Sequence, residues 1–141
     1  PTYDGMQLVL QQNPDREVSL QARPGYLRDW KTELEAVTRL AHAFADQPPT
    51  LSKSHHYVSN GRLESATKTQ IQKGIQSAKK ERTAYDSAFN SNGVRRVAIA
   101  VFAPGSHTFL GILALAEVYQ FSQQADPQHL IQLLRSSIKL S

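Results

Sequence analysis

The segment Lys53-Ser54-His55-His56-Tyr57 places two imidazoles, an ammonium group and a phenol close together in the chain. Histidine titrates near neutral pH, so one imidazole can act as a general base and another as a general acid. A lysine can stabilise charge on a phosphorane, and a tyrosine ring can stack on a nucleobase. These groups are typical of metal-independent RNA cleavage. We therefore predict catalytic roles for Lys53, His55 and His56 and a nucleic-acid contact for Tyr57.

Two alternatives stay open for this segment. Adjacent side chains of an extended chain point in different directions, so at most one of His55 and His56 can be central to a site. The whole segment also fits an exposed polar loop without chemistry. A metal site is disfavoured because no third ligand lies at a convincing spacing. The sequence therefore predicts neither a metal nor another cofactor.

Positive charge is concentrated in the middle of the chain. Residues 53–96 hold nine basic and three acidic residues, a net charge of +6, whereas the remainder holds seven basic and nine acidic residues. Such asymmetry favours an acidic partner, of which nucleic acid is the commonest, although a solvated lysine-rich helix face would give the same count. Lysines interleaved with glutamines suit phosphate contacts that read no base sequence. The predicted contacts are Lys68, Lys73, Lys79 and Lys80.

The elements around these residues follow from hydrophobic periodicity. Residues 50–61 show none and are predicted to form a loop. Residues 63–89 have helical spacing, and Arg82 falls within their apolar stripe. An arginine there must be paired, border a cleft or extend to the rim. We predict that Arg82 enters a pocket beside the histidine segment and anchors an anion, which makes it the fourth catalytic candidate.

The N-terminal third predicts a hairpin and a helix. Residues 6–11 and 18–23 alternate in hydropathy around a turn at residues 12–15. Trp30 belongs to an apolar stripe with a helical period over residues 26–46, which Pro48 and Pro49 end. Glu33 and Glu35 are expected to be solvated, and His42 is expected on the outer flank of the same helix.

The C-terminal third predicts a second hairpin and a closing helix. Residues 95–102 and 108–121 are expected to be strands around a turn at residues 103–107, with a buried helix as the alternative for residues 110–123. Asp126 and Pro127 form an N-cap and first helical position. We predict one compact α+β domain over residues 1–141, in the order ββ–α–α–ββ–α. Its antiparallel sheet of two hairpins has the helices on one face.

Several function classes are disfavoured. The chain lacks cysteine, Walker and Rossmann glycine motifs, H-E-x-x-H and G-x-S-x-G, and no run reaches the ~18 apolar residues of a membrane span. The leading hypothesis is a nucleic-acid-binding domain, RNA more than DNA, and specifically a small metal-independent RNase of toxin or effector type that acts in the cytoplasm. The alternatives are a non-enzymatic protein interaction domain and a NAD-consuming toxin domain, for which no catalytic glutamate can be located.

Overall fold

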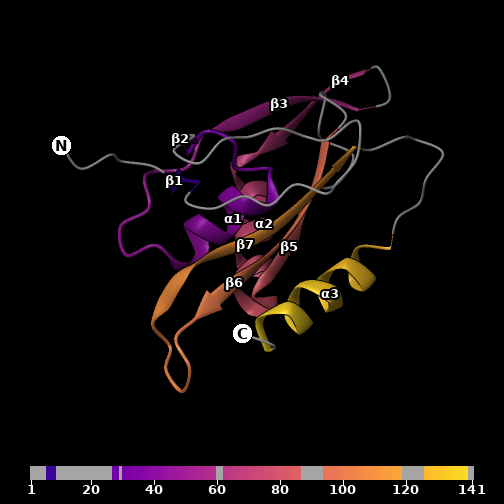
Figure 1. Cartoon of the computed structure of the whole chain (residues 1–141). Coiled ribbons are helices and arrows are strands. Elements are labelled where there is room, and N and C mark those ends of the chain that lie inside the picture. The colour runs from indigo at the N-terminus through magenta and orange to yellow at the C-terminus, as the bar shows by residue number, and fades with distance from the viewer. Residues whose placement is uncertain are drawn as a thin grey trace.

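A three-stranded antiparallel sheet lies between helices in the computed structural model, which describes residues 6–8, 27–28, 30–59, 62–86, 94–118 and 126–139 (Figure 1). Its strands lie in the order β5-β6-β7, and two further antiparallel pairs are β1–β2 and β3–β4. The bounds are β1 Met6–Gln7, β2 Leu27–Arg28, α1 Ala36–Phe44, β3 Ser54–Ser59, β4 Arg62–Thr67, α2 Lys68–Glu81, β5 Thr83–Tyr85, β6 Val94–Phe102, β7 Phe109–Val118 and α3 Pro127–Lys139. The α+β class and the approximate element order are confirmed.

Strand β6 separates two packed cores. Ala98 contacts a cluster to which α1 contributes Leu40 and α2 contributes Ala78. Val97, on the other face of the strand, packs with Ile131 of α3. Helices α1 and α2 thus share one face, as expected, whereas α3 covers the opposite face. A strand that is buried on both sides reads as a continuous apolar run rather than an alternating one, and residues 97–101 contain no polar side chain.

The predicted C-terminal elements are present. Strand β7 pairs with β6 over nearly its whole length, which decides between the strand and helix interpretations of this segment. The turn between them is closed by the Ala103 amide, which donates to the Thr108 carbonyl at 2.9 Å. Asp126 caps α3, because its Oδ1 accepts a hydrogen bond from the Gln128 amide at 2.9 Å. Ile131 and Leu134 form the buried side of α3, whereas Ile138 is exposed.

Helix α1 is shorter than the predicted 26–46, because its N-terminus is set by a residue distant in sequence. The first helical amide, that of Ala36, donates to Oδ1 of Asp86 at 2.6 Å, whereas the Glu35 side chain makes no capping bond. Oδ2 of Asp86 accepts from the backbone amide and the guanidinium of Arg96, both at 3.1 Å. This buried carboxylate therefore connects α1, the end of β5 and β6. Trp30 precedes the helix.

The predicted helix over 63–89 is wrong at both ends. Residues 62–67 pair with β3 as strand β4. Helix α2 begins only after Thr67, whose side chain accepts from the Gln70 amide while the Gln70 side chain accepts from the Thr67 amide. This reciprocal capping box fixes the start of a helix. The helix ends at Arg82, whose backbone is left-handed at φ 56°, and β5 follows immediately.

The N-terminal hairpin is described only in part. Met6 and Gln7 pair with Arg28 and Leu27, rather than with the predicted strand at 18–23, which lies outside the described residues. Asn92 and Gly93, whose residue types predict a stop after the helix over residues 63–89, also lie outside them. Among the helices of the described segments, none has the length and apolar character needed to span a membrane.

Candidate functional site

Residues 54–59, which include both histidines, form strand β3, so the prediction of a loop over residues 50–61 is wrong there; residues 50–53 precede the strand without regular structure. In the antiparallel register, His55 lies opposite Ala66 and His56 lies opposite Ser65. Successive side chains of a strand point to opposite faces, so the two imidazoles face opposite sides of the hairpin. His55 is half-buried and His56 is exposed. The sequence does not predict this strand, because polar residues occupy both of its faces and hydropathy therefore does not alternate along it.

The half-buried His55 faces a carboxylate from the segment before α1. Oε2 of Glu33 lies 3.7 Å from Nδ1 of His55. Glu33 is only 2% exposed, which corrects the expectation that it is solvated. Its Oε1 accepts hydrogen bonds from the Ser52 hydroxyl at 2.6 Å and the Ser52 amide at 2.9 Å. Its Oε2 has no hydrogen-bond partner among the described residues.

Glu33 is ionised despite its burial. Burial by itself would raise the pKa of this carboxyl group, because a low-dielectric environment disfavours the charged form. The hydroxyl and amide of Ser52 and the nearby His55 outweigh burial, so the pKa of Glu33 lies below its ordinary value. A negative charge is thus fixed beside one imidazole and held there from the opposite side by Ser52.

His42 and Trp30 lie near the same carboxylate. His42 is buried rather than on the outer flank of its helix as expected. Its ring meets the Trp30 ring edge to face at 4.9 Å, and its Nε2 lies 3.4 Å from the Trp30 carbonyl oxygen. Burial lowers the pKa of His42, although the Trp30 carbonyl and the charge of Glu33 act in the opposite direction. We call Trp30, Glu33, His42, Ser52 and His55 the Glu33 cluster.

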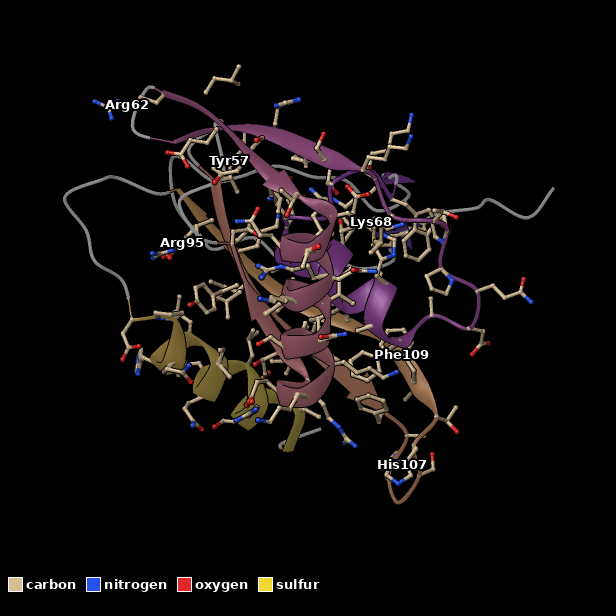
Figure 2. The ribbon with its side chains drawn as sticks, turned by 180° about the vertical axis from the view of Figure 1, so that it is seen from behind. Tyr57, Arg62, Lys68, Arg95, His107 and Phe109 are labelled. Carbon is tan, nitrogen blue, oxygen red and sulfur yellow. The ribbon has the colours of Figure 1, made fainter. Side chains whose placement is uncertain are left out.

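Tyr57 lies further along β3. Its hydroxyl donates to Oε2 of Glu64 on β4 at 3.0 Å. Desolvation, this hydrogen bond and the charge of Glu64 all raise the pKa of Tyr57. The phenol thus has a cross-strand partner at the far end of the hairpin from Lys68, as the labels in Figure 2 show. Stacking of Tyr57 on a nucleobase stays a prediction.

The predicted lysine contacts lie at exposed positions of α2, which together are called its outer side; the helix itself lies in front of the sheet in Figure 2. Ile71 and Ala78 form the buried side of this helix. The exposed positions include Lys68, Gln72, Lys73, Gln76, Lys79 and Lys80. Lys53 adjoins the start of the helix, because its carbonyl oxygen accepts from the Lys68 amide at 3.0 Å. Lys53, His55 and Lys68 are therefore brought to the same end of the molecule.

Arg82 lies at the other end of α2, so its predicted place in a pocket beside the histidines is wrong. The helix has 14 residues and is therefore about 21 Å long. Arg82 follows its last turn, is exposed, and holds its guanidinium 4.6 Å from the ring centre of Phe102. Phe102 in turn contacts Phe44 and Phe109. Arg82 packs on an aromatic group rather than within the stripe of α2.

Two arginines of the basic segment are neutralised within the fold. Arg95 pairs with Glu117 across β6 and β7. Arg96 pairs with Asp86 at 3.1 Å and with Glu35 at 3.6 Å. The sequence count of positive charge therefore overstates what an external partner meets, and the exposed excess lies on α2. In the part of the chain that the structure describes, no group of three histidine or carboxylate side chains could hold a metal ion.

Comparisons with known proteins identify a shared fold but assign the chain to no family. No family model and no curated protein matches the chain. One solved structure, an IclR homolog from Microbacterium hydrocarbonoxydans complexed with 4-hydroxybenzoate, is similar with a TM-score of 0.53 at 14% sequence identity. The match covers 87% of this chain and 48% of that protein, so the chain corresponds to about half of its neighbour's length. This likeness shows a shared fold.

Proposed function

We propose that this chain is a nucleic-acid-binding domain that contacts phosphates through the outer side of α2. The observation that carries the proposal is the excess of exposed positive charge on that side. Residues 68–82 hold five basic residues and one acidic residue. Lys68, Lys73, Lys79 and Lys80 are exposed, and none of them forms an ion pair with another described residue. Such charges are available to release counterions from a polyanion.

RNA is the preferred partner because the histidines of β3 lie near the start of α2. An imidazole that acts as a base there needs a hydroxyl to deprotonate, and only RNA offers the 2′-hydroxyl next to its phosphate. Metal-independent RNA cleavage is accordingly the reaction that we assign to His55 or His56 with Lys53. Arg82 would contact the strand about 21 Å away, at the other end of α2. The glutamines between the lysines can donate to phosphate oxygens without reading bases.

We expect RNA affinity to fall steeply as salt rises. With about four to six phosphate contacts, the slope of log K against log salt should be about −3 to −5. The double variant Lys73→Gln/Lys80→Gln should flatten that slope by about 1.4 for single-stranded RNA. Fluorescence anisotropy of a labelled oligonucleotide over a series of salt concentrations measures both.

A charge-matched control separates a local contact from net charge. Lys31→Gln/Arg135→Gln also removes two positive charges, but it removes them outside α2 and should leave the slope near that of the unmodified chain. Equal flattening by the two double variants would mean that α2 is not the binding surface. A flat response in the unmodified chain would exclude nucleic-acid binding and favour a protein interaction domain.

A second candidate function follows from the structural neighbour, which is complexed with a small aromatic acid, 4-hydroxybenzoate. The Glu33 cluster contains two buried polar atoms without a hydrogen-bond partner among the described residues, Nε1 of Trp30 and Oε2 of Glu33. Buried polar groups in native proteins are normally paired. A small molecule with one acceptor and one donor group would satisfy both.

Titration with 4-hydroxybenzoate tests this second candidate directly. Trp30 is the only tryptophan, so its fluorescence reports on the cluster without labelling. Binding should give a saturable fluorescence change and a melting temperature that rises with ligand concentration. Trp30→Phe, with ligand-induced stabilisation as the readout, checks that the signal depends on the indole N–H. A linear, non-saturating fluorescence response would reject the candidate.

A further inference from the structure

We propose that Glu33 and His55 form a carboxylate–imidazole pair in which Glu33 orients the ring and His55 is the base of RNA cleavage. The inference rests on the proposed function, because that function supplies the substrate. It deepens the proposal by choosing between the two histidines and by adding a positioning residue. Glu33 does not touch the substrate in this scheme and acts through His55.

The first argument is the rigidity of the carboxylate. Glu33 is almost fully buried, and Ser52 occupies its Oε1 with two hydrogen bonds. Oε2 thereby lies 3.7 Å from Nδ1 of His55 and accepts no hydrogen bond from any described residue. A carboxylate in this position favours the tautomer that carries its proton on Nδ1, which leaves Nε2 as an acceptor. The pair thus prepares one particular nitrogen for proton transfer.

The second argument is that His55, unlike His56, combines a fixed orientation with access to solvent. The His55 side chain is 30% exposed, so one edge of the ring can meet a substrate while the other faces Glu33. His56 pairs in register with Ser65, and its side chain lies on the other face of β3 from that of His55. No carboxylate of a described residue pairs with His56. The two imidazoles cannot act on the same phosphate.

The surroundings of His55 also supply positive charge. Lys53 precedes His55 by two residues, and Lys68 begins the helix whose first amide bonds to Lys53. Both lysines are exposed. Ammonium groups at this end of α2 suit the phosphate whose phosphorus the 2′-oxygen attacks. The remaining lysines of α2 extend the same charge along the bound strand.

The chemical step is a transesterification. Nε2 of His55 removes the proton of the 2′-hydroxyl, and the 2′-oxygen forms a bond to phosphorus. The bond from phosphorus to the 5′-oxygen breaks, and that oxygen takes a proton from solvent water. The His55 imidazolium then returns its proton to the resulting hydroxide. The products are a 2′,3′-cyclic phosphate and a 5′-hydroxyl, and no oxidant, reductant or metal takes part.

Glu33→Gln in the full-length chain tests the pair. The glutamine carbonyl can still accept from Ser52, so the shape is kept while the charge is removed. We expect kcat for cleavage of a single-stranded RNA oligonucleotide to fall about 10- to 100-fold with little change in KM. Nitrogen NMR of the His55 ring should show the proton on Nδ1 in the unmodified chain and a mixture of tautomers in the variant. The matched control is Glu35→Gln, which removes a carboxylate two residues away that pairs with Arg28 and Arg96 instead.

Each outcome separates the inference from the function on which it rests. If the unmodified chain binds RNA but does not cleave it, the inference and the assigned cleavage reaction are overturned, while the proposal of a nucleic-acid-binding domain stands. If the chain binds no RNA, both fail. Cleavage by Glu33→Gln at the unmodified rate also overturns the role of Glu33. Should Glu33→Gln not fold, Ser52→Ala loosens the same carboxylate, and it must shift the His55 tautomers and slow cleavage for the pair to hold.

Discussion

Replacing His55 with alanine should lower the rate of RNA cleavage about 10²- to 10⁴-fold, the usual contribution of a general base. The fold should persist, because the ring is half-buried at the edge of the β3–β4 hairpin and outside both packed cores. Affinity for RNA should change little, since the lysines of α2 supply the phosphate contacts. Single-turnover cleavage with excess protein measures the chemical step, and circular dichroism measures the fold.

His56→Ala is the matched control for this prediction. It removes the same side chain from the adjacent position, on the opposite face of β3, and should leave cleavage nearly unchanged. Equal losses in the two variants, or equal retention, would show that neither imidazole performs the reaction. A loss confined to His56→Ala would move the site to the outer face of the hairpin.

The largest loss of stability is expected from Asp86→Ala, with the free energy of unfolding lowered by about 3–5 kcal/mol. The variant leaves the buried Ala36 amide at the start of α1 without an acceptor and removes the nearer of the two carboxylate partners of the half-buried Arg96. Urea denaturation followed by circular dichroism measures the change. Asp46→Ala, at an exposed position after α1, should alter stability by less than about 0.5 kcal/mol. A loss below about 1 kcal/mol for Asp86→Ala would contradict the capping role.

The parts of the fold that local patterns determine could be predicted from the sequence. The apolar run of β6, the turn before β7 and the Asp126-Pro127 start of α3 each specify their element within a few residues. The hairpin β3–β4 could not be predicted in this way, because its strands carry polar residues on both faces and pair through the backbone. Helix α2 did contain a local signal. The Thr67 to Gln70 spacing is a capping box, and it places the helix start after β4.

The same distinction between local patterns and distant contacts applies to the candidate site. Helical periodicity was enough to predict that the α2 lysines are exposed, with Lys68 and Lys79 on one side and Lys73 and Lys80 further round, because exposure there depends on the helix alone. Glu33 could not be identified, because its burial depends on Ser52, which lies 19 residues later in the chain. Arg82 was misplaced because the helix ends one residue before it, in a left-handed conformation that an arginine seldom adopts. Contacts between distant segments, rather than local preference, decided these positions.

The capping of α1 by Asp86 also bears on the order in which the chain acquires its structure. The two partners are 50 residues apart, so the amide of Ala36 gains its acceptor only after α2 and β5 have been synthesised and have packed. Closing so long a loop costs entropy before the contact contributes any stability. Glu33 stands just ahead of α1, but its partners Ser52 and His55 both precede α2 in the chain, so its burial does not depend on this closure. The pair that we assign to chemistry therefore joins segments that lie close in the sequence, whereas the start of α1 depends on a contact with a residue beyond β5.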